Sequence, residues 1–221
     1  MTNKPVGAIA HLRRFPVKSM LGEQPNAVEI TDRGVFGDRA YALIETKTGK
    51  VVSAKSVKLY PDLFACRAAF AEPPRTGEAL PPVRITLPDG TSVTSDSANV
   101  DSVLSAFFRR DVALAQTAPD DFTIDQYHLD LDDPARQKDS VSEAKLGAAL
   151  FAQVGLASPV PVGSFLDVCP VSVLTTSTLD QLNALRPESR FDERRFRMNV
   201  IVHSHEKGFV ENTWVDHVLE I

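Results

Sequence analysis

Short apolar runs, each closed within a few residues by a glycine, proline or aspartate, constrain the fold of this chain most. Runs of this length between turn residues favour β-strands over helices. They recur through the N-terminal half, at residues 6–15, 27–31, 40–44, 51–53, 63–71, 83–87 and 92–94. The spacing therefore predicts an N-terminal half built mostly of short β-strands.

Helical spacing occurs at only a few places. An apolar face made by Val100, Val103, Leu104, Phe107 and Phe108 predicts a helix over about 98–110. A capping pattern that begins at Ser177 predicts a second helix, which ends near Pro187. Further β segments are expected at 165–167, 171–175, 196–202 and 214–221. The chain is thus predicted to be mostly β, of the α+β class, with a few helices.

Length, charge and cysteine content limit the classes of function. A chain of 221 residues suits one large or two small domains, each with its own core. The net charge of −5 argues against a nucleic-acid or anionic-membrane surface, so small molecules or proteins are the expected partners. Cys66 and Cys169 form neither a disulfide framework nor a CxxC metal pair, which favours a reducing compartment. No signal core or membrane-spanning run is visible, which indicates a cytoplasmic protein.

Residues 117–142 form an acidic segment that is broken by Pro119 and Pro134. This composition predicts a solvated loop. An EF-hand calcium site is excluded there, because its glycine and terminal glutamate are missing. Of the five histidines only His203 and His205 share an i, i+2 face, so no zinc site is expected.

A cluster of charges at 190–195 runs into the apolar stretch 196–202. In an extended strand Arg197 and Asn199 would lie side by side, because residues two apart share a face. A guanidinium fork beside an amide can bind an anion and the polar edge of a ring. The alternative is an arginine paired with Asp192 or Glu193, and an asparagine at a strand edge.

Two further turns carry charge. Lys18 and Ser19 follow a strand and a proline, and would present an ammonium and a hydroxyl to a phosphate or a pterin-like ring. They lack the frame of a P-loop, and a plain surface turn is the alternative. Asp38 and Arg39 follow Gly37 where a loop enters a strand, and they serve either a ligand or each other.

Three segments taken together resemble one family: Phe15-Pro16-Val17-Lys18-Ser19, the stretch 34–41 (GVFGDRAY), and Phe196-Arg197-Met198-Asn199-Val200. Their order and spacing closely resemble the MOSC family with its N-terminal β-barrel domain, as in the amidoxime-reducing component of mitochondria and its bacterial relatives. The resemblance implies an N-terminal β-barrel domain at 1–95 and a MOSC β-barrel domain at 96–221. It also implies a cofactor cleft between the two domains.

The resemblance further implies a molybdenum cofactor (molybdopterin) and an oxidoreductase that reduces N-hydroxylated small molecules such as amidoximes. Electrons would come from an iron–sulfur or flavin protein or domain, and the family is also associated with pyridoxal phosphate binding. The residues that match cofactor-contacting positions of the family are Lys18, Ser19, Arg39, Arg197 and Asn199. The loop before Pro170 adds Asp167 and Cys169, with valine and cysteine where hydroxyl residues are common.

The family ligates molybdenum through a cysteine that lies beyond the region matching 214–221. No residue of this chain is therefore assigned as a metal ligand: Cys66 is expected in the core, and Cys169 is off the ligand's position in the motif order. One hypothesis is a fragment of a molybdenum-dependent reductase, with an incomplete MOSC domain. The other is a complete, non-catalytic module that binds a pterin, another anionic ligand or a protein. The β-like ending favours the first, because it leaves a strand edge unpaired.

Overall fold

The computed structural model describes residues 5–128 and 140–220. The chain forms two compact units: one comprises residues 1–13, 24–28 and 171–221, and the other comprises 14–23 and 29–170. Short strands dominate both units, and the described residues contain three α-helices, so the mostly β prediction is confirmed. The sheets formed by these residues are open, and none of them closes into a barrel. The expected division of the chain into domains at 1–95 and 96–221 stays a prediction.

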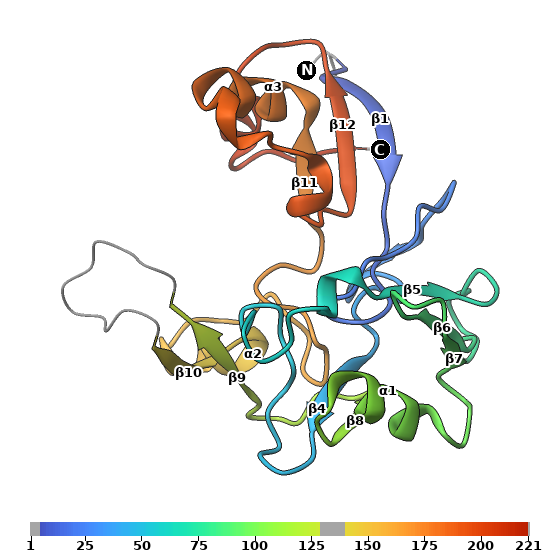
Figure 1. The fold of residues 1–221 in the computed structure, drawn as a ribbon. Coiled ribbons are helices and arrows are strands. Elements are labelled where there is room, and N and C mark those ends of the chain that lie inside the picture. Colours follow the sequence, from blue (N-terminus) through green and yellow to red (C-terminus); the bar gives the residue numbers. More distant parts are fainter. Residues whose placement is uncertain (1–4, 129–139, 221) are drawn as a thin grey trace. The chain divides into compact units, whose positions relative to one another are not determined.

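A three-stranded sheet organises the first unit (Figure 1). The strands β1 (Gly7–Leu12), β12 (Val200–Ser204) and β11 (Val173–Thr175) follow each other in this order. β1 runs antiparallel to β12, with Leu12 opposite Val200, and β11 runs parallel to β12. A parallel pair needs a crossover, which the helix α3 (Thr176–Leu185) provides while packing against β11 and β12.

The first turn of α3 is fixed by Thr175, whose hydroxyl accepts a hydrogen bond from the backbone N–H of Thr178 at 3.0 Å. Such a cap satisfies one of the unpaired donors at a helix start. We expect Thr175→Ala to lower the free energy of unfolding of this unit by about 1 kcal/mol. Urea unfolding checks it, with Thr176→Ala as control, since Thr176 makes only a 3.3 Å side-chain contact to His203. Equal losses in both variants would contradict the capping role.

The described residues of the second unit form four small sheets. Three are antiparallel pairs and one has three strands, in the order β5-β6-β7. The pairs are β2 (Ile30–Thr31) with β3 (Gly34–Val35), β4 (Ala42–Glu45) with β8 (Val112–Ala115), and β9 (Thr123–Tyr127) with β10 (Val141–Lys145). The three-stranded sheet is formed by β5 (Arg67–Phe70), β6 (Val83–Thr86) and β7 (Ser92–Thr94). The expected strand at 63–71 thus begins as a 3-10 turn, Leu63–Ala65.

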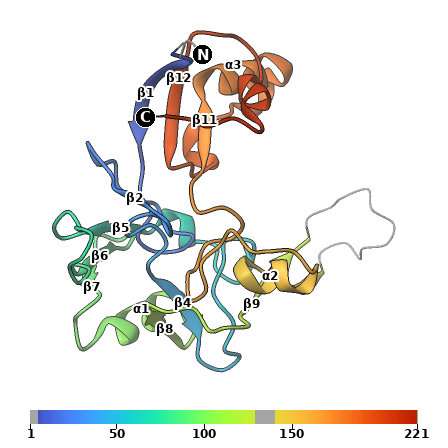
Figure 2. The ribbon, with the colours of Figure 1, turned by 180° about the vertical axis from the view of Figure 1, so that it is seen from behind.

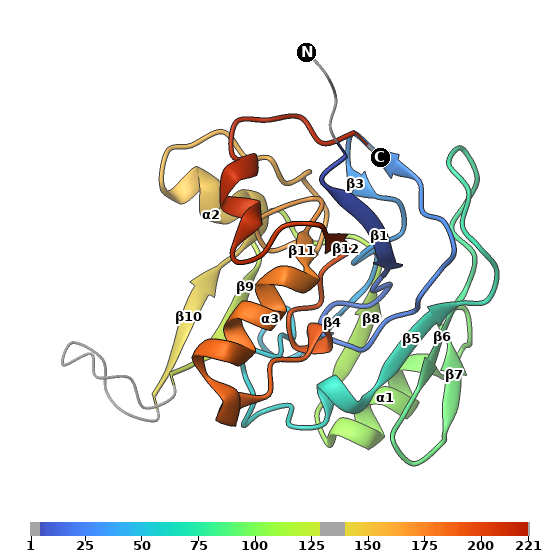
Figure 3. The same ribbon diagram turned by 90° about the horizontal axis from the view of Figure 1, so that it is seen from above.

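The second unit also contains the helices α1 (Val100–Phe108) and α2 (Gly147–Gln153). The helix α1 lies beside the β5-β6-β7 sheet, as Figure 2 shows, and it buries Leu104 as its apolar spacing predicts. The helix α2 lies beside β9 and β10 (Figure 3). Two apolar clusters form the core: a larger one around Met20, Leu43 and Ile85, and a smaller one that contains the fully buried Phe165.

Several sequence-based expectations are wrong in this structure. The β segment expected at 165–167 is irregular chain. The strand expected at 196–202 begins only at Val200, because Arg197 has a left-handed backbone with a φ of +53°. Arg197 and Asn199 therefore do not share a strand face. No strand forms at 214–220, where a 3-10 turn (Val210–Trp214) is followed by irregular chain. The acidic segment is not loop throughout, because 123–127 pairs as β9 with β10, which begins at Val141 within the same segment, and composition alone does not reveal this pairing. Its residues 129–139 lie outside the described residues.

Within the described residues, no helix combines the length and the apolar character needed to cross a membrane.

Candidate functional site

The first two segments that resembled the MOSC family lie against each other in the second unit. The backbone N–H of Lys18 donates to the carbonyl of Tyr41 at 2.8 Å, and that of Tyr41 donates to Pro16 at 2.9 Å. The N–H of Arg39 donates to the carbonyl of Phe15 at 2.8 Å. These bonds hold the Lys18-Ser19 turn beside the loop that carries Arg39.

Lys18 is only 4 % exposed, which is rare for an ammonium group. Its Nζ donates to the carbonyl of Phe165 at 2.7 Å and to a carboxylate oxygen of Asp167. Burial lowers the pKa of Lys18, and the charge of Arg39 lowers it further, while Asp167 opposes the change. An ammonium has three hydrogens, so the two bonds leave one for a further acceptor.

Asp167 also receives a second ammonium that the sequence did not single out. The Nζ of Lys55 donates to its other carboxylate oxygen at 3.1 Å. Burial alone would raise the pKa of Asp167, but the charges and hydrogen bonds of Lys18 and Lys55 outweigh it and hold the pKa well below its usual range. The structure thus brings Lys18, Lys55 and Asp167 into one cluster, which joins three distant parts of the sequence.

This pairing predicts how the stability of the unit depends on pH. Because the folded Asp167 has a lowered pKa, it stays ionised where the unfolded carboxyl, with a pKa of about 4, takes up a proton. Its contribution to stability is therefore present above about pH 4 and is lost as the pH falls further. Urea unfolding between pH 7 and pH 2 should show the gap between wild type and Asp167→Asn closing on the acid side. If the free energies of unfolding of the two proteins changed in parallel with pH, the ion pairing of Asp167 would be contradicted.

Ser19 and Arg39 both adopt the left-handed backbone region, with φ of +65° and +47°. Ser19 is buried, and its hydroxyl oxygen accepts the N–H of Ala54 at 3.0 Å, which attaches the loop that carries Lys55. Arg39 pairs with Asp38 and its guanidinium lies 4.8 Å from the ring centre of Phe15. Asp38 and Arg39 therefore pair with each other, which is one of the two alternatives that the sequence left open for this turn.

Arg39 also lines a cavity of about 330 Å³ within the second unit. The wall beside it includes Gly37, Asp38 and Leu166. Leu166 directly precedes Asp167, so the cavity borders the segment that holds the Lys18 cluster. Of the candidate residues, only Arg39 is among its lining side chains.

Arg197 and Asn199 belong to the first unit. Asn199 is buried, and its side-chain oxygen accepts bonds from the N–H and the hydroxyl of Ser172 at 3.1 and 2.8 Å. Its amide nitrogen donates to the carbonyl of Arg13 at 3.4 Å. Asn199 therefore fixes the entrance to β12, and the left-handed Arg197 lies two residues before it.

Arg13 is a second residue that sequence reasoning missed. Its guanidinium pairs with Glu193, while Arg194 pairs with Asp192 at 2.8 Å. The Nε of Arg13 is buried and has no hydrogen-bond partner among the described residues. A buried, unsatisfied donor of this kind calls for an explanation, and a bound acceptor is one. The only sequence feature that could have pointed to Arg13 is the pair of consecutive arginines before Phe15.

The two cysteines differ in environment. Cys66 is buried, and this burial raises the pKa of its thiol to about 12. Cys169 is exposed, and its side chain forms no disulfide. Among the described residues no group of three or more histidine, cysteine, aspartate or glutamate side chains could hold a metal ion.

We therefore expect a thiol reagent such as DTNB to label Cys169 in the folded protein and to reach Cys66 only after unfolding, because the thiolate is the reactive form. Absorbance at neutral pH should report one reactive thiol, and Cys169→Ser should remove it. Prompt labelling of the Cys169→Ser variant without denaturant would contradict the assignment.

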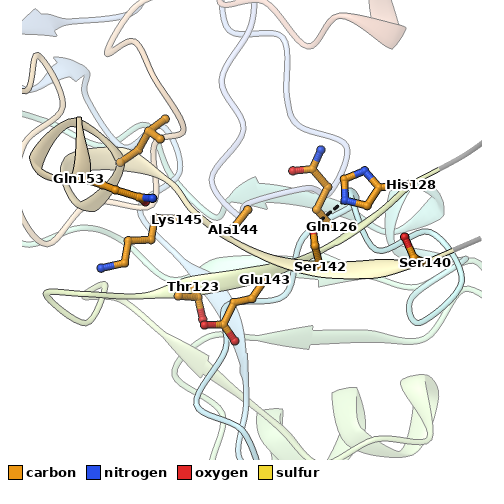
Figure 4. A pocket seen from close by; sticks show the side chains of 10 residues that line it. Thr123, Gln126, His128, Ser140, Ser142, Glu143, Ala144, Lys145 and Gln153 are labelled. Atoms are coloured by element: carbon orange, nitrogen blue, oxygen red, sulfur yellow. Dashed lines mark hydrogen bonds between the residues drawn. The ribbon is translucent and has the colours of Figure 1, made fainter. Parts of the chain in front are cut away.

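A second cavity of about 640 Å³ lies over β9, β10 and α2 (Figure 4). A hydrogen bond of 2.6 Å joins Nε2 of His128 and the hydroxyl of Ser142 there. The charged groups of its wall are already paired: Glu143 with Lys50 at 3.0 Å and Lys145 with Asp121 at 2.7 Å. These pairs connect neighbouring strands and loops, and Lys50 also pairs with Asp125 at 2.6 Å.

Fold and site thus define a mostly β protein whose larger unit holds a buried lysine, Lys18, in an ion-pair cluster with Asp167 and Lys55. A family model described as the MOSC N-terminal beta barrel domain matches residues 6–122, more than half of the 221 residues. The chain belongs to this family. The MOSC family is generally associated with molybdenum cofactor binding, and membership is consistent with a sulfurase-like or oxidoreductase function. No curated protein matches the chain.

Proposed function

We propose that this chain binds the anionic, pterin-bearing part of a molybdenum cofactor and serves in the reduction of N-hydroxylated small molecules. The burial of Lys18 is the observation that carries the proposal. Taking an ammonium out of water costs more than its ion pair commonly returns, so stability alone gives little reason to keep it. A bound anion would explain why the chain keeps a buried ammonium at this position.

Backbone strain supports the same residues. Six non-glycine residues among those described have a positive φ, and three of them are the candidate residues Ser19, Arg39 and Arg197. Left-handed conformations are unfavourable for such residues and cluster at ligand sites, where surrounding structure maintains them. This coincidence favours a binding role for the three family-like segments.

The residues present fit the charged part of such a cofactor. In the second unit, Lys18 and Arg39 would neutralise phosphate and dithiolene charge, and the Ser19 hydroxyl would donate to the pterin edge. In the first unit, Arg197 would offer its guanidinium to an anionic group. Asn199 retains one amide hydrogen beyond its bond to Arg13, and the buried Nε of Arg13 offers another donor. When bound, the cofactor supplies a metal centre for two-electron reduction, with electrons from an iron–sulfur or flavin partner.

The pterin and molybdenum content of the protein, purified from a host that makes the cofactor, tests the proposal. We expect the wild type to carry pterin and Arg197→Ala to lose most of it, because the guanidinium can bind phosphate bidentately. Arg186→Ala is the matched control, since this exposed arginine of the same unit lies 3.9 Å from Glu188.

Wild-type protein without pterin, or an Arg197→Ala variant that retains it, would overturn the proposal. Bound pterin together with no amidoxime reduction, when electron donors are supplied, would favour the non-catalytic binding module instead. The two outcomes separate binding from reduction.

A further inference from the structure

Asp167 lies between two ammonium groups in the second unit. One carboxylate oxygen accepts from the buried Lys18, and the other accepts from Lys55 at 3.1 Å. The nearby guanidinium of Arg39 already has Asp38 as its counter-ion. A protein carboxylate therefore occupies the place where an anionic ligand would meet the two lysines.

We infer that Lys55 is a second cation of the anion site, and that Asp167 is an internal anion that competes with the ligand for both lysines. The inference rests on the proposed function, because it concerns the same site. It assigns Asp167 a role opposite to the ligand contact that the family resemblance implied.

The three side chains differ in their freedom to move. Lys18 is buried and held by the carbonyl of the fully buried Phe165 at 2.7 Å, so its ammonium is fixed. The side chains of Asp167 and Lys55 are 41 % and 39 % exposed, and Asp167 lies in irregular chain. Asp167 can therefore turn toward water together with Lys55, while Lys18 stays in place.

The charges explain why this exchange favours a multiply charged anion. Two ammonium groups and one carboxylate leave a single net positive charge. An anion that binds the two lysines therefore comes close to the carboxylate. Like charges a few ångströms apart repel, and the repulsion is stronger near buried groups than in water. A doubly charged phosphate has more to gain from two lysines than a chloride ion has, so it displaces Asp167 more readily.

Titration with inorganic phosphate tests the inference by isothermal calorimetry, with ionic strength held constant by chloride. We expect Asp167→Asn to bind phosphate about fivefold more tightly than wild type, because the competing charge is gone while the amide oxygen can still accept from Lys18. Lys55→Gln should bind about fivefold more weakly. The matched controls are Asp121→Asn and Lys145→Gln, from an ion pair of 2.7 Å in the same unit, and both should bind like wild type.

Unchanged or weaker binding by Asp167→Asn would overturn the role of Asp167 as a competing anion, and unchanged binding by Lys55→Gln would overturn that of Lys55. If Asp167→Asn does not fold, Lys55→Gln still decides, because it alters a half-exposed side chain. Absence of phosphate binding in wild type and in all variants would remove the anion site itself, and with it the proposed function. Phosphate binding that is lost in Lys18→Met but unchanged in Asp167→Asn and Lys55→Gln would defeat this inference alone.

Discussion

Replacement of Gly34 by alanine is expected to lower the free energy of unfolding of the second unit by about 2–5 kcal/mol. Gly34 has a φ of +98°, and a Cβ added there would lie 2.3 Å from the carbonyl oxygen of Pro170. That oxygen is backbone, so relief requires a shift of the main chain. Two penalties therefore add: the left-handed conformation and the clash. Urea unfolding of the variant measures the sum.

Gly90→Ala separates the two penalties. Gly90 has a similar φ of +89°, but a Cβ there would meet nothing within 4 Å. We expect a loss of only about 1–2 kcal/mol, from conformation alone. Equal losses at Gly34 and Gly90 would show that the contact with Pro170 is unimportant. The contact matters for the site, because Pro170 ends the segment that carries Asp167 and Cys169.

Local patterns predicted the elements whose signals lie within their own residues. The apolar face of 98–110 gave α1 at Val100–Phe108, and the apolar runs 83–87 and 92–94 form β6 and β7 as expected. Each of these elements is specified by side chains a few positions apart. Their boundaries moved by one or two residues.

Elements set by distant partners were not predictable in this way. The expected strand face of Arg197 and Asn199 failed because Asn199 is fixed by bonds to Ser172, 27 positions away. The strand β9 likewise lies within the segment 117–142, whose composition suggested a loop, and its partner β10 extends beyond that segment to Lys145. Periodicity carries no information on such contacts.

The site residues likewise divide into those that local sequence patterns identify and those that only distant contacts reveal. Family-like segments identified Lys18, Ser19 and Arg39, and the structure brings the Lys18-Ser19 turn beside Arg39 through backbone bonds. It also joins Lys18 to Asp167. Lys55 was missed, because only the folded chain brings it to a carboxylate 112 positions away.

Lys18→Met is expected to lower the pterin content of protein purified from a cofactor-producing host at least about tenfold, because it removes the buried charge. Stability should change little. Methionine fills a similar volume without the cost of burying a charge, which offsets the bond lost at the carbonyl of Phe165. Asp167 keeps Lys55 as its partner.

Two measurements on this variant distinguish a binding role from a structural one. Pterin content and melting temperature are compared with those of Lys145→Met, whose lysine is half-exposed and pairs with Asp121 at 2.7 Å. A binding role predicts lost pterin at an unchanged melting temperature in Lys18→Met alone. A structural role predicts a lowered melting temperature together with pterin retained by the folded fraction. Lys18 is buried against the general rule for lysines, so this comparison shows whether the cost of burying it serves a ligand or the fold.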